Sequence, residues 1–116
     1  MSEHTSMGTI EISPAAVATI AGESVLECYG VVGLASKSLI GGLAQILNPE
    51  GARKGVEVRV HEDRITVDLY VIVEYGTRIS EVARGIINRV RYRLEKALGS
   101  PVTEVNIHVQ GLRVSG

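Results

Sequence analysis

The stretch from Arg64 to Gln110 constrains the fold most, because its apolar residues change their period twice. They alternate with polar residues over Arg64–Glu74, recur every three or four residues over Arg78–Leu98, and alternate again over Val102–Gln110. Alternation indicates a strand with one buried face, and the longer spacing indicates an amphipathic helix. Two strands joined through one long helix should lie parallel in a sheet, with the helix on their apolar side.

The chain before this stretch predicts a second helix. Ser13 and Pro14 form a typical helix start, because the serine hydroxyl can accept a free backbone N–H and proline suits the first helical position. Apolar residues at helical spacing continue to Tyr29, and Gly30 suits a left-handed stop. The sequence therefore predicts a helix over Ser13–Tyr29.

Three further segments have the pattern of strands. Thr9–Ile12 and Val56–His61 alternate, and Val31–Ala35 is a short apolar run. Glu62 and Asp63 separate Val56–His61 from the next strand and predict a tight hairpin turn. The expected fold is α+β: a two-layer sandwich with a mixed sheet and two main helices on one face, in the order β-α-β-β-β-α-β.

The 116 residues fit one domain, which we expect over 8–114 after a flexible N-terminal tail at 1–7. One cysteine excludes an internal disulfide and a thiolate zinc cage. Cys28 falls on the apolar side of the first helix, so a buried, unreactive thiol is favoured. The sequence predicts neither a signal peptide nor a transmembrane segment, and the expected compartment is the cytoplasm.

The segment Ser36–Gly55 has helical apolar spacing weakened by Gly41 and Gly42, followed by a turn and two basic residues. We favour a lid over one end of the core; the alternative is a docking element for a partner or a membrane surface.

No motif for catalysis, cofactor binding or metal binding is present. The glycines match neither the phosphate-loop nor the dinucleotide-binding pattern. No serine lies in a nucleophile motif with a recognisable catalytic base. His61, Glu62 and Asp63 carry metal-capable groups, but neighbours in a tight turn rarely converge on one ion, so a solvated turn is favoured. The sequence predicts a protein that is not an enzyme.

Two surfaces are candidates for interactions. If both helices cover one face of the sheet, the other face is open, and we expect it to present Arg59, Asp68, Tyr70, Ile72, Asn106 and His108. With Tyr70 and Ile72 facing outward, this open face could mediate self-association into a homo-oligomer, against the alternative of an ordinary solvated sheet.

The second candidate is a basic helix surface formed by Arg84, Arg89, Arg91, Arg93 and Lys96. Arg78–Lys96 carries six basic and two acidic residues, a net charge of +4 in a chain whose total is -1. A nucleic-acid-binding regulator is therefore an alternative function, although the GXXG loop and the stacking aromatics of RNA-binding modules are missing. A solvated helix face explains most of the basic cluster, so nucleic acid is the less favoured partner.

An ordered series of short motifs resembles the alkaline shock protein family. The series covers about Gly8 to Val114 and consists of Gly8–Ser13, Cys28–Leu34, Lys54–Val56, Val71–Gly76, Ile79–Val82 and Val105–Gly111. Each motif alone is weak, whereas their order along the whole chain is fairly specific.

The resemblance implies an envelope stress response protein of the kind typical of Gram-positive bacteria. Such proteins are non-enzymatic, cytoplasmic and often self-associating, and some are held at the inner membrane by a separate anchor protein. The chain is similar to the short, single-domain branch, which implies a role in cell-envelope or lipid homeostasis and a membrane-anchor or lipid-metabolism protein as partner. The family supplies no catalytic residues and no cofactor.

Overall fold

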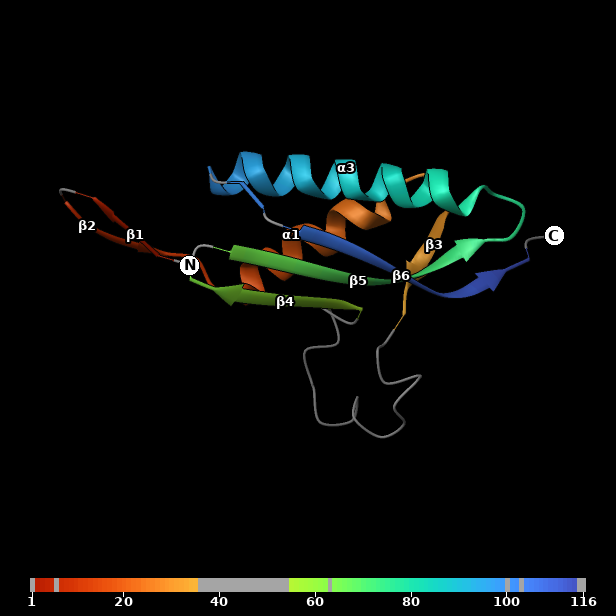
Figure 1. Ribbon diagram of the computed structural model, residues 1–116, viewed down its shortest axis with the longest axis horizontal. Helices are drawn as coiled ribbons and strands as arrows, with labels where there is room; N and C mark the ends of the chain where they lie inside the picture. Colours follow the sequence, from red (N-terminus) through yellow and green to blue (C-terminus); the bar gives the residue numbers. More distant parts are fainter. Residues whose placement is uncertain are drawn as a thin grey trace, which may run out of the picture.

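The computed structural model describes residues 2–5, 7–35, 55–62, 64–99, 101–102 and 104–114, and there it shows two helices packed on one face of a mixed sheet (Figure 1). In chain order the elements are β1 (Ser2–Thr5), β2 (Gly8–Glu11), α1 (Pro14–Leu26), β3 (Val31–Leu34), β4 (Val56–His61), β5 (Arg64–Glu74), α3 (Ile79–Leu98) and β6 (Glu104–Arg113). The predicted α+β class is confirmed.

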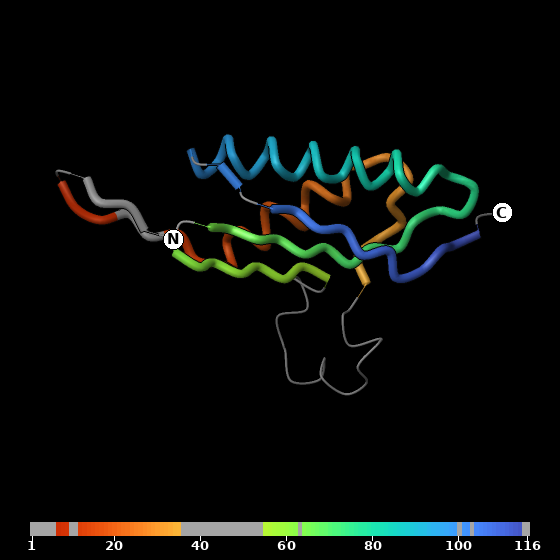
Figure 2. Tube along the Cα trace, in the orientation of Figure 1, coloured from red at the N-terminus to blue at the C-terminus, as the bar shows by residue number. Residues whose placement is uncertain are grey.

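Strand β5 is the centre of the sheet. β6 runs parallel along one edge of β5, and Figure 2 traces the crossover from β5 through α3 into β6. β4 pairs antiparallel with the first half of the other edge and β3 with the second half. β3 and β4 meet at Tyr70, whose N–H donates to the Gly55 carbonyl at 2.8 Å and whose carbonyl accepts the Ala35 N–H at 2.7 Å.

The apolar core lies between β5 and the two helices. All the helix-facing side chains of β5 are at most 1% exposed, namely those of Ile65, Val67, Leu69, Val71 and Val73. Val17, Ala21 and Val25 of α1 are fully buried against them. Because the residues between them in β5 point to the opposite face, the predicted strand register is confirmed.

Each helix follows from local sequence. The Ser13 hydroxyl accepts the Ala16 N–H at 3.1 Å and caps α1, with proline at the first helical position. The long helix ends at Gly99, which adopts the left-handed conformation with φ 73°. Its buried stripe has the predicted spacing and consists of Val82, Ile86, Val90, Leu94 and Leu98.

The N-terminal prediction needs correction. Ser2–Thr5 forms β1 rather than an unpatterned tail, and it pairs antiparallel with β2 in a separate two-stranded sheet. The predicted strand over Thr9–Ile12 corresponds to β2, but β2 does not join the main sheet. Four alternating residues specify a strand without specifying its partner, which is why the sequence pattern missed this pairing.

Two element ends also differ from prediction. The first helix ends at Leu26 rather than Tyr29, because the N–H groups of the next two residues bond to carbonyls only three residues back. The last strand spans Glu104–Arg113 rather than Val102–Gln110. An irregularity in its pairing with β5 at Gln110 breaks the alternation there, and the strand continues beyond it.

The proposed lid or docking helix at 36–54 lies outside the described residues, between Ala35 and Gly55. Within the described chain, neither helix combines the length and the apolar run that crossing a bilayer requires.

Candidate interaction surfaces

The open face of the sheet carries a polar cluster centred on Asp68. Arg59 Nη2 of β4 lies 2.6 Å from Asp68 Oδ2, while Asn106 Nδ2 and His108 Nε2 of β6 lie 3.2 and 3.0 Å from Asp68 Oδ1. Strand register explains the convergence: Asn106 is paired with Asp68, and the other two side chains point to the same face. Two neighbouring strands, β4 and β6, thus contribute donors to one carboxylate on β5.

Asp68 is only 4% exposed, so its charge needs these partners. Burial acts to raise the pKa of the Asp68 carboxyl, but hydrogen bonds from His108, Arg59 and Asn106 together hold that pKa below its ordinary value. The carboxylate therefore stays ionised and holds the cluster together at neutral pH. Such a group fixes side chains on a surface without supplying a nucleophile or a proton donor.

Tyr70 lies beside this cluster, but its predicted outward exposure is wrong. The His108 ring from β6 stacks on the Tyr70 ring with centroids 4.5 Å apart and an angle of 12° between the planes. Tyr70 is consequently only 9% exposed. Within the predicted set, Arg59 is accessible, with 62% of its side chain exposed, and so is His108, with 40% exposed; Ile72 is half-buried.

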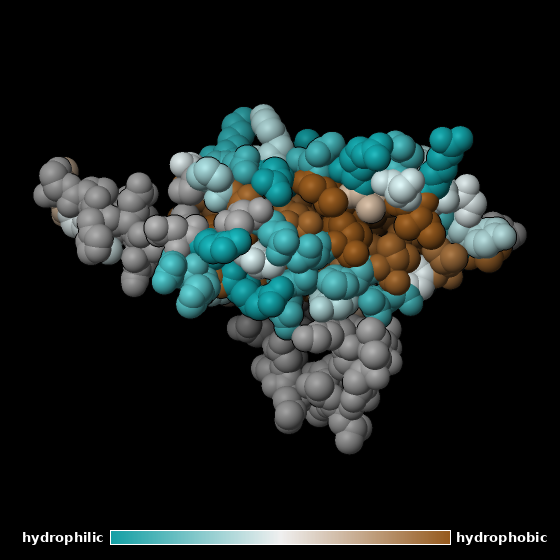
Figure 3. Space-filling model, viewed as in Figure 1, coloured by the Kyte–Doolittle hydropathy of each residue, from teal (hydrophilic) through white to brown (hydrophobic). Residues whose placement is uncertain are grey.

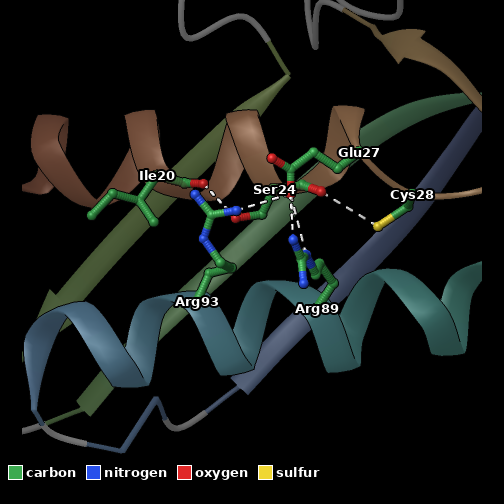
Figure 4. A network of polar contacts seen from close by, with 6 residues as sticks. All are labelled: Ile20, Ser24, Glu27, Cys28, Arg89 and Arg93. Carbon is green, nitrogen blue, oxygen red and sulfur yellow. Dashed lines mark hydrogen bonds and ion pairs between the residues drawn. The ribbon is translucent and has the colours of Figure 1, made fainter.

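The basic helix surface is largely occupied by contacts within the chain. Arg89 and Arg93 both donate to Oε1 of Glu27, the residue that caps the end of α1, with their Nη atoms at 2.8 and 2.9 Å (Figure 4). Hydrogen bonds from Arg89 and then Arg93 hold the pKa of Glu27 below its ordinary value. Glu27 therefore ties the two helices together, a role that sequence spacing could not reveal because the partners are far apart in the chain.

The other three basic residues also have partners within the chain. Those partners are Glu81 for Arg84, the backbone carbonyl of Val102 for Arg91, and the ring of Tyr92 for Lys96. The charge that suggested a nucleic-acid surface is thus used mainly to hold and solvate the long helix.

A cleft of ≈ 620 Å³ lies where the end of α1 meets the start of α3. Cys28 and Val82 line it together with Glu27, Arg78 and Arg89. Burial raises the pKa of the Cys28 thiol, and its Sγ lies 3.4 Å from the Ser24 carbonyl oxygen (Figure 4). Cys28, predicted as a buried and unreactive thiol, is half-buried, and its environment favours the neutral thiol.

The candidate metal-capable turn lies only partly within the described residues. His61 and Glu62 are exposed between β4 and β5, and Asp63 lies outside the described residues. In the part of the chain that the structure describes, no three or more His, Cys, Asp or Glu side chains converge as metal ligands would.

A family model for the alkaline shock protein 23 family, with a cell envelope-related function, matches residues 2–114. The chain belongs to this family. An uncharacterised relative, YloU of Bacillus subtilis (strain 168), is 46% identical over 112 residues, covering 96% of this chain and 93% of YloU. The uncharacterised Spy1614 of Streptococcus pyogenes serotype M6 is 42% identical over 114 residues, covering 97% of this chain and 94% of that relative.

A solved structure of a MamM variant is similar at a TM-score of 0.49, with 14% identity over 87% of this chain and 96% of that chain. The alkaline shock family assignment therefore rests on sequence, and it places the chain among proteins with a cell envelope-related function.

Proposed function

We propose that this alkaline shock family protein is a non-enzymatic interaction module whose open sheet face binds a protein of the cell envelope. The observation that carries the proposal is the Asp68 cluster, in which side chains from three strands are held by hydrogen bonds on a face that no described helix covers. A surface whose side chains are already ordered loses little conformational entropy when a partner binds.

The exposed parts of the cluster suit a polar protein contact. Arg59 bonds to the Asp68 carboxylate with 62% of its side chain exposed, and His108 bonds to the same carboxylate with 40% of its side chain exposed. Arginine is enriched among the residues that dominate protein interfaces. The family function favours an envelope stress or lipid-homeostasis partner, acting on the cytoplasmic side of the membrane.

Photo-crosslinking in living cells of the native host tests the proposal. Arg64 is exposed at the start of β5 on the open face, so a photoreactive residue there should form an adduct with a protein of the envelope fraction. Arg59→Glu should abolish the adduct, because it places a second carboxylate beside Asp68 and reverses the exposed charge.

Arg84→Glu is the matched control, since the Arg84 side chain is 65% exposed on α3, away from the sheet. It should leave the adduct unchanged. An adduct that survives Arg59→Glu, or one that forms equally from position 84, would show that the open face is not the binding surface.

A further inference from the structure

The outer edge of β6 is a second surface, distinct from the open face. Within the described residues β6 pairs only with β5, so ten residues from Glu104 to Arg113 present one unpaired edge. An exposed strand of this length is a ready template for pairing with another strand, and soluble proteins usually cover or interrupt such edges.

An apolar band follows the same edge. Ile79, Ala83 and Ile87 recur every four residues on the flank of α3 opposite to Arg89 and Arg93, which reach α1. Ile79 is 42% exposed and the other two are half-buried. Figure 3 shows a continuous hydrophobic band between α3 and β6.

The strand supplies the other side of this band. Parallel register with the buried residues of β5 places Ile107, Val109 and Leu112 on the helix-facing side of β6. Leu112 is 49% exposed, and the other two are half-buried. A band of this kind at a free strand edge is typical of a protein contact.

We propose that a second copy of this chain covers the edge, with the two β6 strands antiparallel about a two-fold axis at His108. Residues directly opposite in an antiparallel pair point to the same face of the sheet. With the axis at His108, Ile107 of one copy lies opposite Val109 of the other. Gln110 has no partner in β5, where it forms a bulge, and it forms a bulge between the two β6 strands as well.

Charge complementarity supports this register. Beyond the bulge it places Val105 opposite Leu112, and Glu104 opposite Arg113, of the second copy. Among the described residues, Glu104 makes only a 3.5 Å side-chain contact, with Asn106, and Arg113 makes no side-chain ion pair. The two-fold axis places one Glu104–Arg113 pair at each end of the paired β6 strands. If the axis lay nearer either end of β6, Glu104 or Arg113 would fall outside the paired strands.

The helices fit the same symmetry. A two-fold axis perpendicular to the sheet keeps both helix layers on one side, so the Ile79, Ala83 and Ile87 flank of each α3 faces its symmetry mate across the joined strands. The contact is isologous and closes at two copies.

Charge reversal with rescue tests the pairing by sedimentation velocity over a concentration series. Glu104→Arg places two arginines opposite each other at both ends, so the dimer dissociation constant should rise about tenfold at low salt. Arg113→Glu should act likewise. The double variant, Glu104→Arg with Arg113→Glu, restores the opposite charges and should return the constant to within about threefold of wild type.

The apolar band has its own variant and control. Ile79→Glu introduces a charge into the band, while an acidic residue in the first turn of α3 is compatible with the helix dipole. It should weaken the dimer at least about tenfold. Leu26→Glu, at a 57% exposed apolar residue of α1, should leave association unchanged.

Cysteine pairing reports the register directly. In a Cys28→Ser background, the double variant Glu104→Cys with Arg113→Cys should form a disulfide-linked dimer, because opposite residues in this pairing have Cα atoms at a bridging distance. Glu104→Cys alone should not crosslink.

A wild type that is monomeric at every concentration would overturn the proposal. So would a dimer whose dissociation constant is unchanged by both charge reversals. Ile79→Glu, on α3 at the opposite side of the sheet from the Asp68 cluster, leaves the Arg59 surface intact, so failure here is separable from failure of the open-face adduct.

Discussion

At the residue scale, Asp68 shows how a strand pattern can place a side chain without describing its surroundings. Alternation correctly assigns Asp68 to the face opposite the helices, among residues expected to be solvated. Its near-complete burial depends on Arg59 and His108 reaching it from two neighbouring strands, which only the register brings together. No local signal in the sequence specifies that convergence.

Asp68→Asn should destabilise the protein by about 1–3 kcal/mol at pH 7, because it removes the charge that three donors satisfy. Folding lowers the pKa of Asp68, so the ionised carboxylate stabilises the folded protein. This contribution to the free energy of unfolding is complete above the ordinary carboxyl pKa and is lost as the pH falls through the folded-state pKa. Urea midpoints should therefore differ at pH 7 and converge toward pH 2. Glu23→Gln on exposed α1 is the control, and a pH-independent difference for Asp68→Asn would refute the charge assignment.

Replacing Gly55 by alanine should lower the stability of the protein, whereas replacing Gly85 should raise it. Gly55 has φ +80°, and a Cβ there would lie 2.6 Å from the Ala35 carbonyl oxygen and 2.9 Å from that of Tyr70. Gly55→Ala should therefore separate β3 and β4 from β5 and lower stability by more than about 1 kcal/mol. Gly85, inside α3, has open space around its missing Cβ, so Gly85→Ala should add about 0.5–1 kcal/mol. Thermal midpoints that fall for both variants would contradict this distinction.

At the element scale, the long helix divides cleanly into a buried and a solvated side. Ile86 is fully buried, whereas the Arg84 side chain is 65% exposed and forms an ion pair with Glu81 on the same helix. Ile86→Ala should cost about 2–5 kcal/mol, and Arg84→Ala less than about 0.5 kcal/mol. Denaturant midpoints measure both; equal shifts would mean that the helix face is wrongly assigned.

The contact between the helices adds an electrostatic element to this packing. Glu27 accepts hydrogen bonds from Arg89 and Arg93, and all three side chains are reachable by solvent. Glu27→Gln should lower the thermal midpoint at low salt, and the difference from wild type should shrink as added salt screens the ion pairs. Glu81→Gln, which removes a pair within one helix, should have a smaller effect. A deficit for Glu27→Gln that persists at 1 M salt would indicate packing rather than charge.

The sequence predicted the periods of the elements well and their ends and partners less well. β4 and β5 have the predicted bounds because two segments of alternating apolar and polar residues are separated only by a short polar turn. β1 was missed because a short polar strand lacks an apolar period, and the end of β6 was missed because Gln110 interrupts alternation. The open-face residues were predicted as a set, whereas the Glu27 contact required knowing how α1 and α3 pack.

At the scale of the whole molecule, β5 connects every part of the main sheet. It pairs with β3, β4 and β6, and its apolar face lies under both helices. The core cannot be divided into one half under α1 and another under α3 without breaking this strand. We therefore expect the main sheet and both helices to unfold as one cooperative unit.

Hydrogen exchange should rank the elements by this connectivity. Amides in the middle of β5, where both edges are paired and the side chains of Val67, Leu69 and Val71 are fully buried, should exchange only through global unfolding and be the slowest in the protein. Within the described residues, β1 and β2 pair only with each other in a separate sheet, so their amides should exchange through local opening. Ile86→Ala should accelerate exchange in β5 by the full loss of global stability and leave the β1–β2 amides unchanged. NMR measures the exchange rates in both sheets, under conditions where the protein refolds faster than an open amide exchanges. Equal acceleration in β5 and in the β1–β2 hairpin would show that the hairpin belongs to the same cooperative unit.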